Sequence, residues 1–330
     1  MAPVHDAHVI LLQTKRMSSE RRYVRTVRGS GLESTGHTGT SEDDRSKRRV
    51  TVRGLEMAYV EEGVGDPIVL LHGNPSSSYE WRNIIPYLAR LGHCVAPDLI
   101  GMGDSAKLAA SGPGSYRFVE HRAYLDAFLD AMDVHDRVTL VLRDWGTALG
   151  FDWAYRHPDV VRGIAYMEAF VAPIESWSEW PEPSLAPFQA LRSGAGEHMV
   201  LDQNFIIEEL LPHDVLRALS ETEMAEYRRP YLQPGESRRP TLTWPREVPV
   251  GGEPADVTQV ILDYADWLAT SPVPKLFIEA VPGAMFPSHR DIARSWPIQD
   301  HITVTGGHLV PEDAPQDIAA ALASWLAQLP

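Results

Sequence analysis

The chain has 330 residues, of which 44% are hydrophobic and 23% charged, so it can bury the core of a large globular domain. Its formal net charge is −15, and because residues 1–50 carry more Lys and Arg than Asp and Glu, the remainder is more acidic still. An acidic body argues against nucleic acid as a partner. The single cysteine, Cys94, excludes an internal disulfide and a cysteine-rich metal site, and no apolar run is long enough to span a membrane. We therefore expect a cytoplasmic protein that acts on a small molecule.

Residues 1–48 are rich in Ser, Thr, Gly and Arg and show no hydrophobic period, which predicts a disordered N-terminal extension. A basic targeting segment, and a true start farther downstream such as Met17, are the alternatives. The folded part is expected to begin near Arg49, because residues 50–60 have the pattern of two strands that turn at Gly54.

From residue 67 onward, short apolar runs alternate with helical patterns. Strands are predicted at residues 67–71, 93–97, 138–142, 163–170, 273–279 and 301–305, and helices at 76–91, 118–132 and 316–329. This alternation is typical of a mostly parallel, doubly wound α/β sheet. Residues 171–270 are rich in Pro and Trp and predict a helical cap, inserted between core segments 49–170 and 271–330.

The stretch Val138–Gly150 carries the clearest chemical signal. A buried strand runs into Asp144 and Gly146 with no linker before a helical pattern begins. The nucleophile of α/β-hydrolases sits on such a strand–turn–helix elbow, here with Leu142 at the first small position and Gly146 at the second. The helix N-terminus favours a charged Asp144, whose carboxylate can displace a leaving group from carbon. Asp is also a common helix N-cap, so this stretch alone leaves both interpretations open.

Further polar residues follow the predicted strands, where the active groups of parallel sheets gather. His308 comes after a strand and two glycines and is the expected general base on water. Its ring needs a carboxylate partner, for which Glu168 and Glu279 compete. Asn74 and Trp145 offer backbone and side-chain N–H donors that suit an oxyanion or a departing halide. Taken singly, each donor has a simpler explanation in loop hydrogen bonding or packing.

A dinucleotide site is excluded by the glycine spacing. Gly101 and Gly103 match part of the dinucleotide fingerprint, but no third glycine follows at the right offset and no helix opens there. No dinucleotide cofactor is therefore expected, and the hydrolytic reaction given below needs neither an organic cofactor nor a metal.

Several motifs together resemble those of the haloalkane dehalogenases, from about Arg49 to the C-terminus. The matching segments are His72–Pro75, Ser78–Arg82, Asp98–Ser105, Asp144–Gly146, Met167–Glu168, Asp202–Asn204 and Gly307–His308. This resemblance implies an α/β-hydrolase fold with Asp144 as nucleophile, His308 as base and Glu168 as acid. It also implies that Asn74 and Trp145 clamp the halide.

The resemblance further implies an apolar pocket beneath the cap. Its expected lining residues are Phe170, Trp177, Trp180, Pro183 and Phe188. Pro183 departs from the family, because an aromatic pocket residue is expected there. The sequence therefore does not define the shape of the tunnel that leads to the pocket.

A second departure lies beside the nucleophile. Arg143 stands where the family usually has His, which places a cation next to Asp144 and can alter the pKa of the site. Glu279 is left as a structural group, because the family places the acid at Glu168.

The expected reaction converts a haloalkane to an alcohol, a halide ion and a proton through an alkyl ester on Asp144. An epoxide hydrolase is the nearest alternative and would need cap tyrosines such as Tyr227 and Tyr231, but Asn74 favours halide. A coelenterazine-type luciferase-like monooxygenase is a second alternative. A ligand-sensing relative without turnover is a third, against which the intact triad argues. The protein is expected to act as a monomer or small homo-oligomer.

Overall fold

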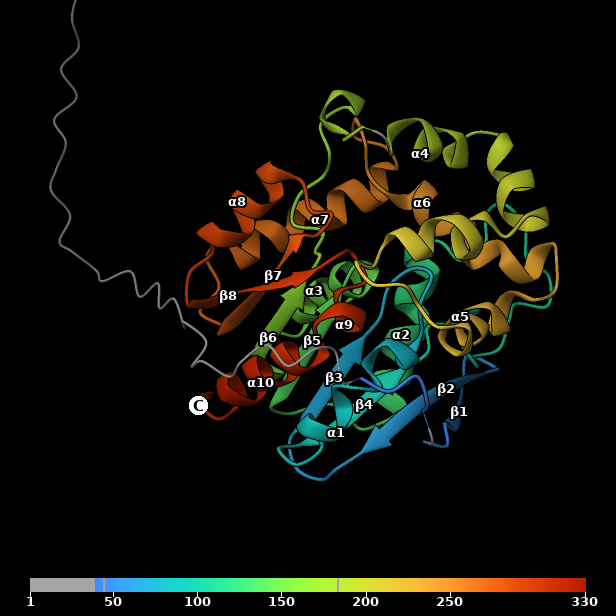
Figure 1. Ribbon diagram of the computed structural model, residues 1–330. Coiled ribbons are helices and arrows are strands. Elements are labelled where there is room, and N and C mark those ends of the chain that lie inside the picture. Colours follow the sequence, from blue (N-terminus) through green and yellow to red (C-terminus); the bar gives the residue numbers. More distant parts are fainter. Residues whose placement is uncertain (1–38, 44, 183) are drawn as a thin grey trace, which may run out of the picture.

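The computed structural model describes residues 39–43, 45–182 and 184–330 (Figure 1). Eight strands form one sheet in the order β1-β2-β4-β3-β5-β6-β7-β8. They are β1 (Arg48–Val52), β2 (Leu55–Glu62), β3 (Pro67–Leu71), β4 (His93–Pro97), β5 (Val138–Arg143), β6 (Val161–Met167), β7 (Lys275–Pro282) and β8 (Gln299–Gly306). The β1–β2 and β2–β4 pairs are antiparallel, and all other pairs are parallel. The predicted doubly wound α/β sheet with a helical insertion is confirmed.

Helices cover both faces of this sheet and build the cap. The α-helices are α1 (Ile85–Leu88), α2 (Phe118–Ala131), α3 (Trp145–Arg156), α4 (Leu185–Arg192), α5 (Glu221–Arg228), α6 (Arg239–Glu247), α7 (Ala255–Leu268), α8 (Pro287–Ser295), α9 (Val310–Asp313) and α10 (Pro315–Leu326). The short 3-10 and π segments are η1 (Ser78–Trp81), η2 (Pro158–Val160), η3 (Trp177–Glu179), η4 (Glu197–Asp202), η5 (Ile206–Leu210), η6 (Leu211–His213), η7 (Arg229–Tyr231) and η8 (Glu236–Arg238). Among the described residues, no helix is both long and apolar enough to cross a bilayer.

Strand β5 lies in the middle of the sheet and is buried on both faces. Leu140 and Leu142 belong to the core cluster that also holds residues of α2, α3 and α7. Val141, between them, belongs to the opposite cluster with residues of α1 and α10. Because successive side chains of a strand point to opposite faces, an apolar run is what such a central strand requires. The end of β5 is thereby held rigidly at the rim of the sheet, below the cap helices (Figure 1).

Helix α7 covers the sheet, although its residues fall inside the segment predicted as cap. Tyr264 of α7 packs its ring 5.4 Å from that of Phe151 in α3, and its hydroxyl donates to the Phe170 carbonyl at 2.6 Å. Through these contacts α7 joins the core residues Phe151 and Phe170. Helical patterns continue from the cap through α7, so the sequence alone does not show that α7 contacts the core.

The folded part begins before the predicted boundary at Arg49. The Thr40 carbonyl accepts from Arg82 Nε at 2.7 Å, and the Tyr79 hydroxyl donates to the Ser41 carbonyl at 2.5 Å. Polar contacts dock this segment, and a search for hydrophobic period does not detect them. The prediction of disorder for residues 1–38 lies outside the described residues.

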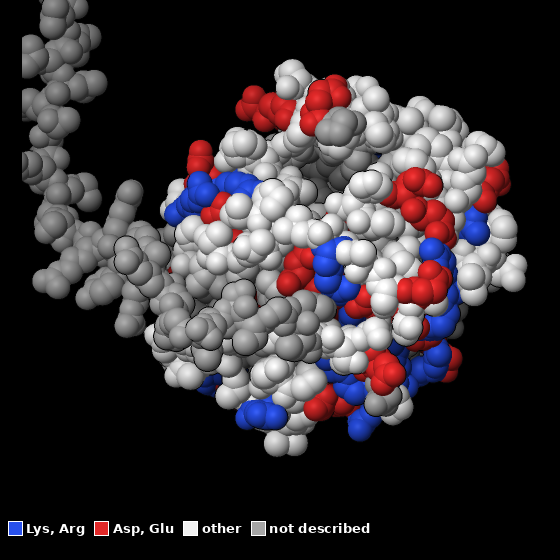
Figure 2. Space-filling view, in the orientation of Figure 1, with Lys and Arg blue, Asp and Glu red and all other residues white. Residues whose placement is uncertain are grey.

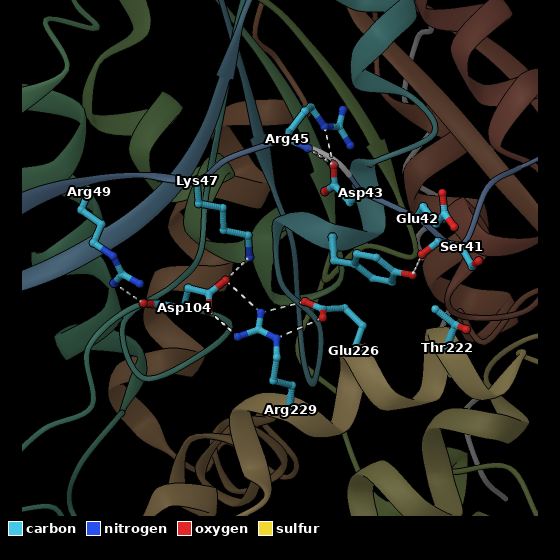
Figure 3. A pocket seen from close by; sticks show the side chains of 11 residues that line it. Ser41, Glu42, Asp43, Arg45, Lys47, Arg49, Asp104, Thr222, Glu226 and Arg229 are labelled. Atoms are coloured by element: carbon cyan, nitrogen blue, oxygen red, sulfur yellow. Dashed lines mark hydrogen bonds and ion pairs between the residues drawn. The ribbon is translucent and has the colours of Figure 1, made fainter.

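A pocket of about 570 Å³ lies where this N-terminal segment meets the loop after β4 and helix α5 (Figure 3). Its charged side chains pair with one another. Lys47 Nζ lies 2.9 Å from Asp104 Oδ2, and Arg229 bridges Asp104 and Glu226 at 2.9 and 2.7 Å. The pocket is a polar junction of the N-terminal segment, the core and the cap.

Lys47 also neutralises a buried carboxylate in the core, and its removal should cost stability. Its Nζ lies 2.7 Å from Oδ2 of Asp98, a fully buried side chain. Lys47→Met should lower the free energy of unfolding by about 3 kcal/mol, because Asp98 would lose its closest cation. Urea unfolding measures this. Arg48→Met is the matched control, since Arg48 pairs with Glu61 at the surface and should change stability little. Equal losses in both variants would contradict the account.

Candidate active site

Asp144 occupies a sharp turn between β5 and α3. Its backbone has φ 50° and ψ −128°, a left-handed conformation that is strained for a residue with a side chain. The carboxylate makes no capping bond to α3. Instead, Oδ2 accepts from the backbone N–H of Asn74 at 2.8 Å. The strained turn thus directs the carboxylate towards the end of β3 and not along its own helix, which favours the elbow interpretation over the N-cap.

Two glycines make room for this turn. A Cβ on Gly73 would lie 2.2 Å from Asp144 Oδ2, so only glycine lets the β3 loop approach the carboxylate. A Cβ on Gly150 would lie 2.4 Å from Leu142 Cδ2. Gly150 therefore provides the space for Leu142, the large residue at a position where elbows usually have a small one.

His308 and Glu168 complete a line of side chains with Asp144. His308 lies between β8 and α9, and its Nε2 is 3.4 Å from Asp144 Oδ1. Its Nδ1 is 3.0 Å from Glu168 Oε2, which also accepts from the backbone N–H of Ala284 at 2.7 Å. Glu168 has φ 48°, again in the left-handed region, directly after β6. The structure thus brings together the three residues predicted as nucleophile, base and acid.

Glu279, the competing carboxylate, faces other partners. Its oxygens lie 3.0 Å from Arg290 Nη1, 3.1 Å from Arg294 Nε and 2.8 Å from His301 Nε2. These charges hold the pKa of Glu279 below its usual value, although burial opposes this. Glu279 is therefore bound in a separate ion-pair cluster.

The two carboxylates strongly affect the charge of His308. Burial of the ring disfavours its protonated form, but hydrogen bonds with Asp144 and Glu168 more than offset this and raise the pKa of His308 to about 10. Burial likewise opposes the charge of Asp144, yet His308 and Arg143 hold the pKa of Asp144 below its usual value. The two carboxylates thus favour the protonated form of His308, and His308 in turn favours the ionised form of Asp144.

Asn74 and Trp145 both adjoin Asp144, the first through its backbone N–H and the second as the next residue in the chain. The side-chain amide of Asn74 donates to the Thr241 carbonyl at 3.3 Å, which uses one of its two N–H groups. The Trp145 ring lies 4.5 Å from the ring of Phe170 and 4.5 Å from that of Trp244. Packing between two rings fixes the plane of the indole, and with it the direction of the indole N–H.

The predicted pocket residues fall into two groups. Phe170 lies against Trp145, as described above. Trp177, Trp180 and Phe188 are half-buried in the cap, where Trp180 lies 5.3 Å from Trp177, 4.2 Å from Phe188 and 5.5 Å from Phe286. Pro183 lies outside the described residues. Figure 2 shows a hollow on this side of the cap, near α4.

Two aromatic neighbours of the site were not predicted from the sequence. Trp244 of α6 packs on Trp145 and also stacks on the buried ring of His121, whose centroid lies 4.2 Å away. Trp244 lies in a proline-rich part of the cap, far from any strand end, so no strand-end rule could find it.

Comparisons with known proteins agree with this geometry. Residues 66–197 match the family model described as alpha/beta hydrolase fold. The chain is 56% identical over 284 residues to a haloalkane dehalogenase of Sphingobium indicum, covering 86% of this chain and 96% of that protein. A haloalkane dehalogenase of Mycolicibacterium smegmatis is 55% identical over 280 residues, covering 84% and 90%.

Solved structures give the same result. The crystal structure of haloalkane dehalogenase DbeA from Bradyrhizobium elkani superposes with a TM-score of 0.81 at 43% sequence identity, covering 86% of this chain and 98% of that chain. DatA from Agrobacterium tumefaciens gives a TM-score of 0.80 at 35% identity, covering 87% and 98%. With relatives this similar over most of both chains, the protein belongs to the haloalkane dehalogenases, hydrolases of α/β-hydrolase fold that act on carbon–halide bonds.

Proposed function

We propose that Asp144, His308 and Glu168 carry out the dehalogenation through a covalent alkyl ester, with Asn74 and Trp145 as halide donors. The observation that carries this proposal is the orientation of the Asp144 carboxylate. Its Oδ2 faces the backbone N–H of Asn74, whereas Oδ1 faces His308 Nε2. One oxygen is thus held by a backbone donor, and the other is left to react.

In the first step, Asp144 Oδ1 attacks the carbon that bears the halogen. The carbon–oxygen bond forms as the carbon–halogen bond breaks, and the halide leaves with the bonding electron pair. The side-chain N–H groups of Asn74 and Trp145 stabilise the developing negative charge. The product of this step is an alkyl ester on Asp144.

In the second step, water attacks the ester carbonyl carbon. His308 Nε2 accepts a proton from the water, and Glu168 stabilises the imidazolium through Nδ1. The backbone N–H of Asn74 stabilises the oxyanion on Oδ2. Collapse breaks the bond between the carbonyl carbon and the alkyl oxygen, and His308 returns a proton to the departing alcohol. The remaining proton leaves to solvent, which regenerates the Asp144 carboxylate.

Formation of the ester makes His308 a base. The raised pKa of His308 depends on both neighbouring carboxylates. Esterification neutralises Asp144, so the imidazole loses one stabilising charge and its pKa falls. The ring can then release its proton to solvent, and the neutral imidazole is able to accept a proton from the attacking water.

Removing either halide donor should slow the reaction strongly. Asn74→Ala and Trp145→Phe should each lower kcat/KM by an amount equivalent to about 3 kcal/mol, by analogy with the loss of one oxyanion donor. Initial rates of bromide release from 1-bromobutane measure this. Trp267→Phe is the matched control, since Trp267 lies in α7 and contacts Tyr155, outside the predicted pocket. Full activity in both donor variants would remove them from the mechanism.

The epoxide alternative has less structural support. Tyr227, one of the two cap tyrosines that could protonate an epoxide, donates its hydroxyl to Glu312 at 2.5 Å. Tyr231, the other, is fully buried beneath the Lys107 ammonium, which lies 4.7 Å from its ring. Halide release from 1-bromobutane and 1,2-dibromoethane, compared with diol formation from matched epoxides, tests the choice. Diol formation without halide release would favour the epoxide hydrolase. If neither halide nor diol formed, the luciferase-like or ligand-sensing alternatives would be favoured.

For its partners, we propose a small apolar haloalkane and the halide ion, with neither nucleic acid nor membrane, and a cytoplasmic location. The acidic net charge of −15 supports this proposal, because phosphate backbones and anionic lipid surfaces would repel such a body.

A further inference from the structure

Arg143 is a buried cation between the nucleophile strand and the base. It is the last residue of β5, directly before Asp144, and its side chain is fully buried. Its Nη1 donates to Glu80 Oε2 at 3.1 Å, and its Nε donates to the backbone carbonyl of His308 at 3.2 Å. One side chain thus connects the strand that carries the nucleophile with the peptide group of the proposed base.

The loop that carries His308 is held at three successive residues. The backbone N–H of Gly307 donates to Asp313 Oδ2 at 2.8 Å, and the backbone N–H of Leu309 donates to the Asp214 carbonyl at 2.8 Å. Of these three contacts, the one from Arg143 reaches His308 itself. It also comes from the residue directly before Asp144, so it links the backbone of His308 to the turn that carries the nucleophile.

The ion pair with Glu80 is a costly way to fill the core. Burying an arginine and a glutamate removes both charges from water, and their mutual attraction seldom exceeds this desolvation penalty. Burial raises the pKa of Glu80 to about 7 even though Arg143 opposes the shift. Among the described residues, Arg143 Nη2 is buried without a hydrogen-bond partner. Because the pair contributes little net stability, a role in the reaction accounts for it better than packing does.

We propose that Arg143, with Glu80 as its counter-ion, is a positioning residue that holds His308 for hydrolysis of the ester. The inference rests on the roles proposed above for Asp144 and His308. Arg143 contacts the base and not the carboxylate oxygens that attack the substrate. Its loss should therefore slow the second step and leave the first step largely intact.

The test follows both steps separately in the full-length protein. Rapid mixing with 1-bromobutane, acid quenching and intact mass spectrometry give the rates of ester formation and ester decay. Arg143→Lys keeps a cation for Glu80 but removes the Nε donor to His308. We expect ester decay to slow about tenfold, the effect of losing one well-placed hydrogen bond, with ester formation nearly unchanged.

Two further variants separate positioning from stability. Glu80→Gln weakens the ion pair but keeps the Arg143 contact with His308, so it should lower the melting temperature while ester decay stays near the wild-type rate. The double variant Arg143→Met with Glu80→Met removes both charges, so it should regain stability yet keep the slow ester decay.

Wild-type decay in the double variant, or a parallel loss of both rates in Arg143→Lys, would overturn the inference. Failure of the wild-type protein to form an ester at all would instead overturn the proposed mechanism, so the two failures are distinguishable.

Discussion

Replacing His308 by alanine should lower turnover strongly and leave the protein trapped as an alkyl ester. Nε2 of His308 lies 3.4 Å from Asp144 Oδ1 and is the proposed acceptor of the water proton. Alkylation needs the Asp144 carboxylate and the halide donors, whereas hydrolysis needs the base. His308→Ala should therefore release one equivalent of halide and then stop, with turnover lowered about 10²- to 10⁴-fold.

Intact mass spectrometry after incubation with 1-bromobutane measures this outcome. The His308→Ala protein should gain the mass of one butyl group, and digestion should place that group on the peptide containing Asp144. The matched control is His289→Ala, because His289 lies in α8 and packs on Phe286, away from the elbow. An unmodified mass together with one released equivalent of halide would argue against an ester.

Replacing Glu168 by glutamine should lower kcat far more than the same change at Glu279, the competing carboxylate. Glu168 Oε2 lies 3.0 Å from His308 Nδ1, so the imidazolium formed during water attack depends on its charge. By analogy with the buried carboxylate of serine-protease triads, kcat should fall roughly 10³-fold or more. The pKa of His308 should also fall, because one of the two carboxylates that raise it would be gone.

Glu279→Gln is the control that distinguishes the two carboxylates. Glu279 is also buried but is bound by Arg290, Arg294 and His301, so its loss should cost stability and change kcat little. Steady-state rates are to be compared at a temperature where both variants are folded. If Glu279→Gln were the more damaging change to kcat, the acid would have to be assigned to β7.

The proximity of Asp144, Glu168 and His308 was predictable because each of them follows a strand. Asp144 and Glu168 come directly after β5 and β6, and His308 follows β8 after one intervening glycine; parallel strands bring their carboxyl ends to one edge of the sheet. The sequence could not decide between Glu168 and Glu279 without the family resemblance. That choice depends on a backbone turn with φ 48° at Glu168 and on the cations around Glu279.

Contacts between distant polar groups could not be predicted. The salt bridge of Lys47 with Asp98 joins a residue just before β1 to a residue just after β4. Such a contact between polar groups leaves no hydrophobic period in the sequence. Arg143 was visible as a departure from the family, but its contacts with Glu80 and with the His308 carbonyl depend on three-dimensional packing. Trp244 is a similar case, because its contact with Trp145 depends on how the cap folds over the core.

The most direct test of the central claim, that Asp144 forms the ester, is a single turnover in water enriched in ¹⁸O. Water attacks the ester carbonyl in this mechanism, so the alcohol takes its oxygen from Asp144 and the label enters the carboxylate. With enzyme in excess over 1-bromobutane, the alcohol should be unlabelled, and the peptide containing Asp144 should carry one ¹⁸O. Labelled alcohol from the first turnover, with an unlabelled Asp144 peptide, would show that water attacks the substrate directly and would contradict the account.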